Sequence, residues 1–372
     1  MKIALVHDYL VQYGGAERVL ESFVRAFPTA PIYTLLYDER ATHRAFAHCD
    51  VRTSFLQNII GARRHHRLFP LLMPLAIESF DLSRFDVVLS DSSSFAKSVI
   101  TRPETVHISY IHTPMRYAWD DCQKYTSDFG GMPSIVKRWV PFAMTRMRIW
   151  DRVGAMRVDH MIANSEFVSR RIHKYYRQNA TVINPPVDIS RFRLCRELYD
   201  AELARSGYIL MVGRLIAYKR HDLAIRAANR LKFPLYIIGR GPEEARLRAL
   251  AGPTVRFLSR IDDDELARYY ANARAFVFPQ EEDFGIVAIE AMAAGRPIIA
   301  FRGGDIAERL RTPEQGVFME AQTVDALCDA IQRFESLQFN HEEIARAAEQ
   351  FDKSVFERKI RGYVEDVMER RI

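Results

Sequence analysis

The chain has 372 residues, 48% of them hydrophobic, and a formal net charge of +6. This length is enough to bury two cores of ordinary size, so we predict two domains. No apolar run reaches the roughly eighteen residues that a membrane-spanning helix needs, and the N-terminus is charged too early for a signal peptide, so we expect a cytoplasmic protein. The four cysteines stand far apart, which argues against a disulfide framework and against a zinc site.

The positive charge is unevenly distributed along the chain. Residues 1–190 contain 24 Lys and Arg against 18 Asp and Glu, whereas residues 191–372 contain 29 of each kind. Within the first half, residues 137–177 hold ten basic side chains and three acidic ones. Such a segment fits an anionic membrane surface or an acidic substrate, and an ordinary solvated helix face is the alternative. It follows no recognised nucleic-acid-binding motif, so nucleic acid is not expected as a partner.

Apolar strand-like runs alternate with helical patterns along the whole chain, which is typical of parallel sheets covered by helices. The runs in the first half are 3–7, 32–36, 87–90, 107–111, 161–163 and 181–183. Those in the second half are 208–212, 235–238, 255–258, 275–278 and 297–300, with helical patterns over 222–231, 264–272 and 284–294 between them. Each half is therefore predicted to be a doubly wound α/β domain.

Prolines and a glycine mark the predicted domain boundary. Pro185 and Pro186 stop the last strand of the first half, and Gly207 precedes the first strand of the second. We expect one domain over 1–190, a second over 191–353, and a closing helix over 354–372 that returns to the first domain. Ligands of such domains bind beyond the carboxyl ends of the strands, so the site is expected in the loops that face a cleft between the domains.

The first predicted strand is followed by two glycines, Gly14 and Gly15, at the start of an amphipathic helix. Glycine lets the backbone approach a ligand closely at a helix N-terminus, so both are candidate binding residues. A plain strand-to-helix turn is the alternative. The dinucleotide fingerprint G-x-G-x-x-G is absent here, and Gly239-Arg240-Gly241 lacks its third glycine, so nicotinamide binding is weakly supported.

His112 follows directly after the strand-like run 106–111, and a proline comes two residues later. We therefore expect its imidazole on a loop at the carboxyl end of that strand. A neutral imidazole there can hydrogen-bond a hydroxyl or stabilise developing charge, and it need not act as a base. A packed loop histidine is the alternative. His107, in the middle of the run, is interpreted as a structural residue.

Arg214 and Lys219 lie on one loop after the strand-like run 208–212. Two cations at that position suit a diphosphate, since arginine binds it through its planar fork and lysine as a point charge. A solvated loop is the alternative.

The segment 280–290 is the most informative part of the chain, because Glu282 and Glu290 bracket Gly285 where a strand gives way to a helix. The first backbone N–H groups of a helix have no partner within it and attract anions, phosphate above all. Gly285 and Ile286 are placed at this helix start.

The triplet Asp262-Asp263-Asp264 resembles a D-x-D metal motif, but it leads straight into a helical pattern. Acidic residues are favoured at the N-cap and first turn of a helix. We therefore interpret the triplet as a helix start and predict no metal site.

Taken together, these motifs resemble the family 4 retaining glycosyltransferases of the GT-B fold. Glu282 and Glu290 have that family's E-x7-E spacing, and Gly213-Arg214 with Lys219 matches its G-R-x(4,5)-K loop. The pair Gly303-Gly304 with Glu308 matches a further element. The resemblance spans nearly the whole chain, and residues 1–20 and 112–117 are similar to the mannosyltransferase branch that builds bacterial surface polysaccharides.

The resemblance implies a role for each of these residues. Arg214 and Lys219 would neutralise the diphosphate of a sugar-nucleotide donor, in place of a metal. His112 and Glu282 would contact the donor sugar, and Glu290 would accept hydrogen bonds from the ribose. The remaining implied donor-binding residues act mainly through their backbone: Gly14, Gly15, Gly239, Ile261 in the turn that reads the base, Gly285, Ile286 and Val287.

Aromatic and apolar side chains accompany the basic residues of 137–150, and another apolar stretch lies at 67–74. This mixture suits the headgroup region of an anionic membrane, and a peripheral contact at the inner face of the cell membrane is one interpretation. Core helix packing is the other, because Pro141 is expected to interrupt a long helix lying on a membrane.

The resemblance therefore implies a metal-independent, retaining hexosyltransferase with no cofactor besides its nucleotide-sugar donor. The expected transfer is of mannose from GDP-mannose onto a polysaccharide or a lipid-linked oligosaccharide. Two rivals stay open. A sugar-nucleotide epimerase of the same architecture would convert the donor without an acceptor, and a non-catalytic glycan-binding protein would bind without transfer.

Overall fold

The structure is a computed structural model that describes residues 1–65, 69–120, 134–193, 196–259 and 261–371. The chain divides into two compact units, unit 1 with Met1–Pro186 and Phe356–Ile372 and unit 2 with Val187–Val355. The short helix α8 (Ile189–Phe192) lies in unit 2, so the chain changes unit a few residues earlier than the sequence suggested. Among the described residues, no helix combines the length and the hydropathy needed to span a membrane.

Unit 1 contains a seven-stranded, fully parallel sheet with the strand order β3-β2-β1-β4-β5-β6-β7. Its strands are β1 (Ile3–His7), β2 (Ile32–Thr34), β3 (Val51–Thr53), β4 (Val87–Ser92), β5 (Val106–Ile111), β6 (His160–Ala163) and β7 (Ala180–Val182). The order reverses between β1 and β4, which makes the carboxyl ends of these two strands the switch point of the sheet.

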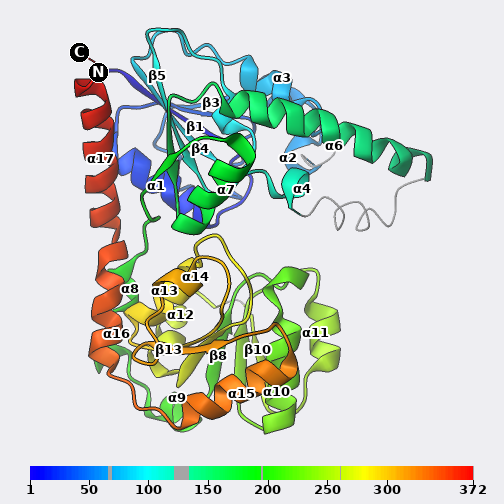
Figure 1. Ribbon diagram of the computed structural model, residues 1–372, viewed down its shortest axis with the longest axis vertical. Helices are drawn as coiled ribbons and strands as arrows, with labels where there is room; N and C mark the ends of the chain where they lie inside the picture. Colours follow the sequence, from blue (N-terminus) through cyan, green and yellow to red (C-terminus); the bar gives the residue numbers. More distant parts are fainter. Residues whose placement is uncertain (66–68, 121–133, 194–195, 260, 372) are drawn as a thin grey trace. The chain divides into compact units, whose positions relative to one another are not determined.

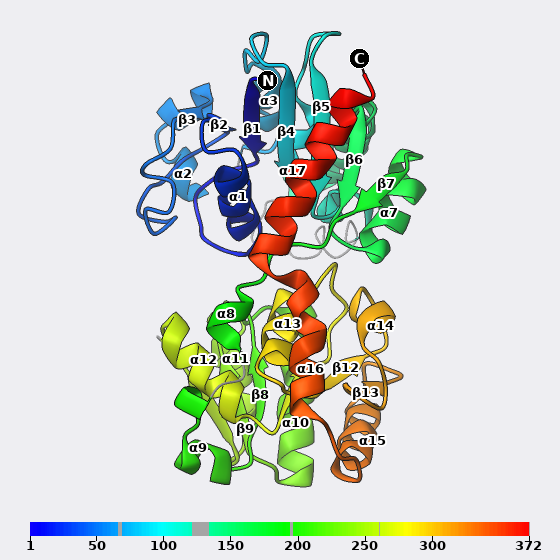
Figure 2. The same ribbon diagram turned by 90° about the vertical axis from the view of Figure 1, so that its left-hand side faces the viewer.

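Helices cover both faces of this sheet, as buried parallel strands require. They are α1 (Gly15–Ala26), α2 (Ala62–His65), α3 (Met73–Glu78), α4 (Arg116–Trp119), α6 (Ser134–Ala155), α7 (Glu166–Tyr176) and α17 (Lys353–Glu369), with short 3-10 turns η1 (Phe55–Asn58) and η3 (Ala96–Ser98). The last helix, α17, crosses the strands of unit 1 on the face that also carries α1 (Figure 2). There Phe356 of α17 stacks on Phe23 of α1, and Glu357 pairs with Arg25.

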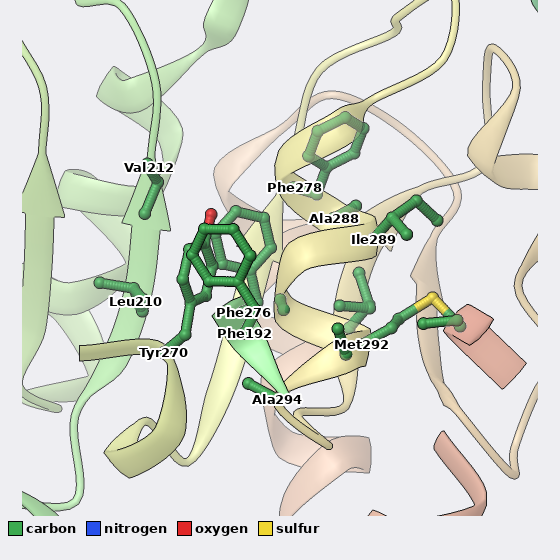
Figure 3. Close-up of a cluster of buried hydrophobic side chains, with 14 of the residues drawn as sticks. Phe192, Leu210, Val212, Tyr270, Phe276, Phe278, Ala288, Ile289, Met292 and Ala294 are labelled. Carbon is green, nitrogen blue, oxygen red and sulfur yellow. The ribbon is translucent and has the colours of Figure 1, made fainter. Parts of the chain in front are cut away.

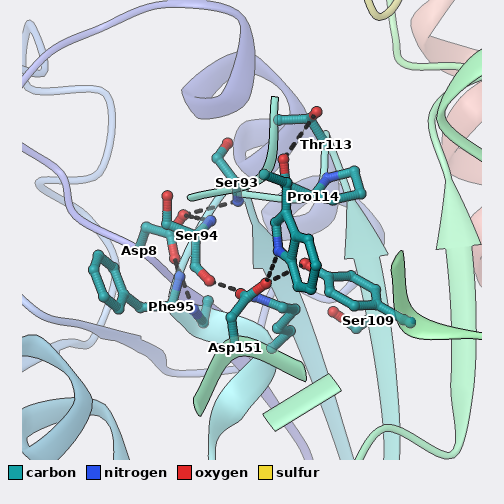
Figure 4. A network of polar contacts seen from close by, with 12 residues as sticks. Asp8, Ser93, Ser94, Phe95, Ser109, Thr113, Pro114 and Asp151 are labelled. Atoms are coloured by element: carbon teal, nitrogen blue, oxygen red, sulfur yellow. Dashed lines mark hydrogen bonds and ion pairs between the residues drawn. The ribbon is translucent and has the colours of Figure 1, made fainter. Parts of the chain in front are cut away.

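The longest helix is α6, and it differs from the sequence expectation because Pro141 lies inside it without ending it. Proline removes one backbone hydrogen bond, but tertiary contacts compensate for that loss. The inner side of α6 is held by Asp151, a fully buried carboxylate that accepts hydrogen bonds from Lys97 Nζ (2.5 Å), Trp119 Nε1 (2.7 Å) and Tyr176 Oη (2.9 Å) (Figure 4). The Asp8 carboxylate is likewise an acceptor, because the backbone N–H groups of residues 93–96, in the turn after β4, donate to it at 2.6–2.8 Å.

Unit 2 contains a six-stranded parallel sheet with the order β10-β9-β8-β11-β12-β13. Its strands are β8 (Ile209–Val212), β9 (Leu235–Ile238), β10 (Val255–Leu258), β11 (Ala275–Phe278), β12 (Ile298–Phe301) and β13 (Gly316–Met319). Its helices are α8, α9 (Ala201–Arg205), α10 (His221–Leu231), α11 (Glu244–Leu250), α12 (Asp263–Asn272), α13 (Ile286–Ala293), α14 (Ile306–Arg309), α15 (Val324–Glu335) and α16 (His341–Ala348), with 3-10 turns η4 (Arg196–Leu198), η5 (Ala217–Lys219) and η6 (Glu349–Phe351).

One core of unit 2 fixes α13, the helix that carries Glu290 and follows the loop with Glu282. Helix α13 packs through Ala288, Ile289 and Met292 against Phe276 and Phe278 of β11, with Tyr270 and Phe192 beside them (Figure 3). These side chains are almost completely buried. The start of α13 therefore lies at a defined position beyond the carboxyl end of β11.

Every strand-like run expected from the sequence corresponds to a strand, and both domains are doubly wound as predicted. The sequence missed β3 and β13, which form one edge of the first sheet and one edge of the second. Both are short, with three and four residues, so neither produces a clear periodic signal.

Candidate active site

The loops at the carboxyl end of the unit 2 sheet bring Lys219 and Glu282 together. Lys219 ends the turn η5 after β8, Glu282 follows β11, and their side chains form an ion pair while only 13% and 15% exposed. Gln280, buried at 1% exposure, donates from Nε2 to Glu282 Oε1 at 3.2 Å. Arg214 stands on the same β8 loop with an exposed side chain. We call Arg214, Lys219, Gln280 and Glu282 the unit 2 cluster.

The backbone of Glu282 is braced by the loop after β12. Asp305 N–H donates to the Glu282 carbonyl at 3.1 Å, and a Cβ on Gly304 would lie only 2.4 Å from that carbonyl oxygen. Gly304 also has φ +68°, a conformation that favours glycine. The Gly303-Gly304 element thus has a packing role, because it lets two loops touch backbone to backbone and fixes Glu282.

Gly285 is the N-cap of α13, as the sequence predicted, with φ +77° and ψ +57°. A Cβ there would lie 2.7 Å from the ring of Phe278, so a side chain is excluded by space as well as by conformation. The N–H groups of Gly285, Ile286 and Val287 have no acceptor within the described part of the chain. Unpartnered N–H groups at a helix start can bind an anion, so the prediction of an anion site here, close in sequence to Glu282, stays open.

Glu290 lies one turn further along α13 and is 2% exposed. Tyr270 Oη of α12 donates to its Oε2 at 2.9 Å, which stabilises a carboxylate that burial would otherwise disfavour. The structure therefore gives Glu290 an internal partner that the sequence did not indicate, and its role toward a ribose stays a prediction.

Close packing requires a glycine at position 239 in this structure. A Cβ at Gly239 would lie 1.9 Å from the Gly213 carbonyl oxygen, and one at Gly241 would lie 2.3 Å from that of Leu215. The β9 loop thus packs directly on the β8 loop that carries Arg214 and Lys219. Ile261 is half-buried against the α13 core, and the structure assigns neither residue a ligand contact.

The aspartate triplet is a helix start, as expected. Asp262 is the N-cap of α12 and accepts from Asp264 N (3.0 Å) and Glu265 N (2.8 Å), with Glu265 completing a capping box. The Asp262 carboxylate is thus engaged in capping, and Asp263 pairs with Arg191.

His221, which the sequence analysis did not single out, is buried at the first position of α10, two residues after Lys219. Neither ring nitrogen has a hydrogen-bond partner among the described residues. Burial, followed by the positive charge of Lys219, lowers the pKa of His221 to about 4, so the ring is neutral at neutral pH.

In unit 1 the carboxyl ends of β1, β4 and β5 bring three titratable side chains together. The strand register places His7 directly opposite Asp91, and His112 follows β5. Asp91 Oδ2 lies 2.9 Å from His7 Nδ1, and its Oδ1 lies 2.5 Å from His112 Nε2. We call these residues the unit 1 triad. Asp91 is fully buried, His7 is nearly so, and the His112 side chain is 14% exposed.

The charges of the unit 1 triad stabilise one another. Burial acts to raise the pKa of Asp91, but the charge and hydrogen bonds of His112 and His7 outweigh it and lower that pKa. Burial acts to lower the pKa of His7, but the hydrogen bond and charge of Asp91, together with the charges of Glu17 and Asp8, outweigh it and the pKa of His7 is raised. An ionised Asp91 accepts from both rings. A neutral His112 therefore donates from Nε2 and presents Nδ1 as its acceptor.

Neighbouring groups hold His112 and the glycine loop in place. Asn164 Nδ2 donates to the His112 carbonyl at 2.9 Å, and the Tyr110 ring meets the imidazole edge to face at 5.3 Å. Helix α1 starts at Gly15 with Gly14 as N-cap, and Gly14 N–H donates to the buried Glu17 at 2.8 Å. Gly15 is exposed. Of the two glycines, Gly14 already has a partner for its N–H group.

Sequence reasoning missed Gln280, His221, Asp91 and His7. A usable signal existed for the last two, since His7 ends the strand-like run 3–7 and Asp91 directly follows the run 87–90, at the edge where ligands of parallel sheets bind. Nothing in the sequence indicated that they would pair with each other and with His112.

Two doubly wound domains with parallel sheets, each with polar side chains gathered beyond the carboxyl ends of the strands, have the architecture of a GT-B type enzyme. Two family models match the chain: "Glycosyltransferase Family 4" over residues 13–191 and "Glycosyl transferases group 1" over residues 201–351. The chain belongs to the family 4 glycosyltransferases.

Curated relatives match part of the chain. The D-inositol 3-phosphate glycosyltransferase 2 of Catenulispora acidiphila is 31% identical over 193 residues, 43% of this chain and 44% of the relative. A GDP-mannose-dependent monoacylated alpha-(1-6)-phosphatidylinositol monomannoside mannosyltransferase of Corynebacterium glutamicum is 30% identical over 199 residues, 47% of this chain and 52% of the relative. The matches thus span about half the length of these relatives.

Solved structures match nearly the whole chain at low identity. Anabaena HepE in complex with UDP gives a TM-score of 0.73 at 17% identity and covers 98% of this chain and 100% of its own. Sucrose-phosphate synthase from Thermosynechococcus elongatus gives 0.73 at 16% identity, with 99% of both chains covered. These similarities establish the GT-B fold.

Proposed function

We propose that the protein is a retaining hexosyltransferase that moves mannose from GDP-mannose onto a polysaccharide or a lipid-linked glycan. The observation that carries the proposal is the unit 2 cluster. It places two cations and a carboxylate in loops that follow neighbouring strands, and the helix start at Gly285, with its unpartnered N–H groups, comes three residues after that carboxylate. A sugar diphosphate has the matching chemistry, because its negative charge needs cations and its hydroxyls need a carboxylate.

Each residue then has a role in donor binding. Lys219 and Arg214 neutralise the diphosphate, the N–H groups of Gly285, Ile286 and Val287 bind the phosphate or sugar hydroxyls, and Glu282 holds the transferred sugar. Glu290 accepts from the ribose once it turns from Tyr270. The other binding residues proposed are Gly14, Gly15, Gly239 and Ile261.

The ion pair between Lys219 and Glu282 implies an exchange on binding. A diphosphate that reaches Lys219 competes with the Glu282 carboxylate, and the displaced carboxylate is then available to the sugar hydroxyls. Gln280, which donates to the same carboxylate, keeps Glu282 near this position during the exchange.

The transfer breaks the bond between the anomeric carbon and the leaving phosphate oxygen and forms one bond to the acceptor oxygen on the same face. The acceptor hydroxyl proton passes to the leaving diphosphate. Lys219 and Arg214 stabilise the negative charge that develops on that diphosphate, which is the largest contribution expected from the protein. His112, held by Asp91, contacts the sugar near the reacting carbon, and no metal ion is required.

A thermal-shift panel tests the donor and the metal requirement together. GDP-mannose, UDP-sugars and ADP-sugars are compared with and without EDTA, and a donor at a hundred times its Kd should stabilise the protein by about 2.7 kcal/mol. We expect GDP-mannose to give the largest shift and EDTA to leave it unchanged. A larger shift with a UDP-sugar would overturn the donor assignment, and loss of the shift in EDTA would overturn the metal-free mechanism.

Product analysis separates transfer from its rivals. Donor and acceptor candidates are incubated together and the new linkage is examined by NMR, where retention of the donor anomeric configuration is expected. An inverted linkage contradicts the proposed mechanism. Conversion of the nucleotide sugar without any acceptor would identify an epimerase, and glycan binding without turnover would identify a binding protein.

A further inference from the structure

The outer side of α6 carries large apolar side chains that are about half exposed or more in the described part of the chain. They recur at intervals of seven, four and three residues, which places them in one stripe along the helix. The members on the helix and their exposed fractions are Phe142 (56%), Ile149 (59%) and Val153 (47%), and Met156 (66%) continues the stripe in the turn directly after the helix.

Arginines flank this stripe. Arg138, Arg146 and Arg152 are exposed on the helix, and Arg146 lies over the Phe142 ring at 5.2 Å. Asp151 is the one acidic residue in the sequence of α6, and it points inward to Lys97. The exposed side of the helix therefore combines apolar contact with positive charge and offers no carboxylate of its own.

The inner side of the same helix is firmly attached, so the stripe has a fixed direction. Met147, Asp151, Gly154 and Ala155 are buried, and a Cβ on Gly154 would overlap Ser98 at 2.0 Å. Figure 1 shows α6 extending away from the strands of unit 1. An amphipathic helix held along one side in this manner presents its other side to a partner.

A second apolar segment adjoins α6. Trp150 Nε1 donates to Glu78 of α3 at 3.0 Å, and Arg157 pairs with the same carboxylate. One turn before Glu78, Leu75 is 62% exposed, and Leu71 at 65% precedes the helix. We define the α3/α6 face as Leu71, Leu75, Phe142, Arg146, Ile149, Arg152, Val153 and Met156.

We propose that the α3/α6 face docks on the surface of an anionic lipid bilayer. Apolar side chains enter the boundary between headgroups and acyl chains while arginines at their flanks bind the anionic headgroups. A second copy of the chain fits less well. Two-fold pairing of the stripe would bring Arg138, Arg146 and Arg152 of both copies together with no exposed carboxylate on either helix to neutralise them.

Vesicle flotation of the full chain without donor or acceptor tests the docking. The probes are vesicles of phosphatidylcholine alone and vesicles that also contain phosphatidylglycerol. We expect binding to the second kind only, weakened by high salt. Because neither substrate is present, a failure of the docking proposal is distinguishable from a failure of the proposed function.

Two double variants separate the apolar from the ionic contribution. I149S with V153S should lower the vesicle partition coefficient by at least about tenfold. R146Q with R152Q should lower it about twenty-five-fold, since each arginine near the surface accounts for about fivefold. The matched controls are I100S in unit 1 and R358Q with R361Q on α17, which remove exposed side chains elsewhere and should bind as the wild type does.

Circular dichroism and sedimentation complete the test. The replaced side chains are exposed, so all variants should keep the wild-type spectrum and melting temperature. If both double variants have the same vesicle partition coefficient as the wild type, the proposal is overturned. A wild-type dimer that the α6 variants dissociate also overturns it, since the face would then be an interface between copies of the chain.

Discussion

The two units each place a carboxylate between positively charged or polar groups at the carboxyl edge of a parallel sheet, but they do so in different ways. In unit 2 the pair Lys219 and Glu282 stands on loops, partly exposed, where a ligand can compete for it. In unit 1 Asp91 is fully buried between two imidazoles that belong to neighbouring strand ends. The first arrangement suits an exchange of partners on binding, and the second suits a fixed orientation.

The same contrast appears in the histidines. The pKa of His7 is raised because Asp91 outweighs burial, whereas the pKa of His221 is lowered to about 4 because burial acts together with Lys219. His7 therefore contributes stability below pH 6.5 that is lost as pH rises through its raised pKa. His221 opposes folding once the pH falls below 6.5, because its protonation is easier in the unfolded chain.

The largest effect is expected at the exchangeable pair in unit 2. Lys219→Ala should lower the transfer rate about a hundredfold, because it removes a cation aimed at the leaving diphosphate, and Arg214→Ala should lower it at least about tenfold. Steady-state kinetics with donor and acceptor measure both. Arg226→Ala removes an exposed cation of α10 and is the control. A full rate in Lys219→Ala would contradict the clamp.

The fixed triad of unit 1 should respond next. Asp91→Asn should lower the transfer rate tenfold to a hundredfold (about 2 kcal/mol) while the donor KM changes little, because His112 loses the acceptor that sets its tautomer. The pH profile of kcat distinguishes this from a packing defect, since only loss of orientation moves the profile. The control is His107→Gln, because His107 is a buried histidine outside the triad that is hydrogen-bonded to Ser90. An unchanged pH profile of kcat would show that Asp91 has only a structural role.

The third effect sharpens the contrast between the two histidines. His221→Leu should stabilise the protein relative to wild type as pH falls from 6.5 toward 4, by about 2 kcal/mol at pH 5, since the unfolded chain no longer gains from protonating that imidazole. Urea unfolding at a series of pH values measures this. His173→Leu, on the exposed side of α7, is the matched control. Parallel pH curves for wild type and His221→Leu would refute the buried neutral histidine.

The smallest effect tests the exchange itself. Glu282→Gln should bind GDP or UDP about fivefold more tightly, because the diphosphate no longer competes with a carboxylate for Lys219, although transfer should slow. Isothermal titration with the nucleotide alone is the measurement, and Glu281→Gln at the exposed neighbouring position is the control. Weaker nucleotide binding would show that Glu282 supports the site instead of competing for it.

The unit 2 cluster could largely be predicted from sequence, because its parts are short contiguous motifs in loops. Gly285 was placed at a helix start and Asp262 at another, and both are N-caps in the structure. What the motifs did not predict is their mutual contact. The pair of Lys219 with Glu282 and the partner Tyr270 for Glu290 depend on side chains 63 and 20 residues apart in the chain.

Sequence alone determined the alternation of strands and helices, the two-domain organisation and the loops that carry the charged motifs, because these follow from local periodicity and turn chemistry. Tertiary structure decided the rest. The unit 1 triad exists because β1 and β4 pair in a register that sets His7 opposite Asp91 across 84 residues. Helix α6 continues past Pro141 because buried contacts outweigh one lost backbone hydrogen bond. Both outcomes depend on long-range packing, which no local pattern encodes.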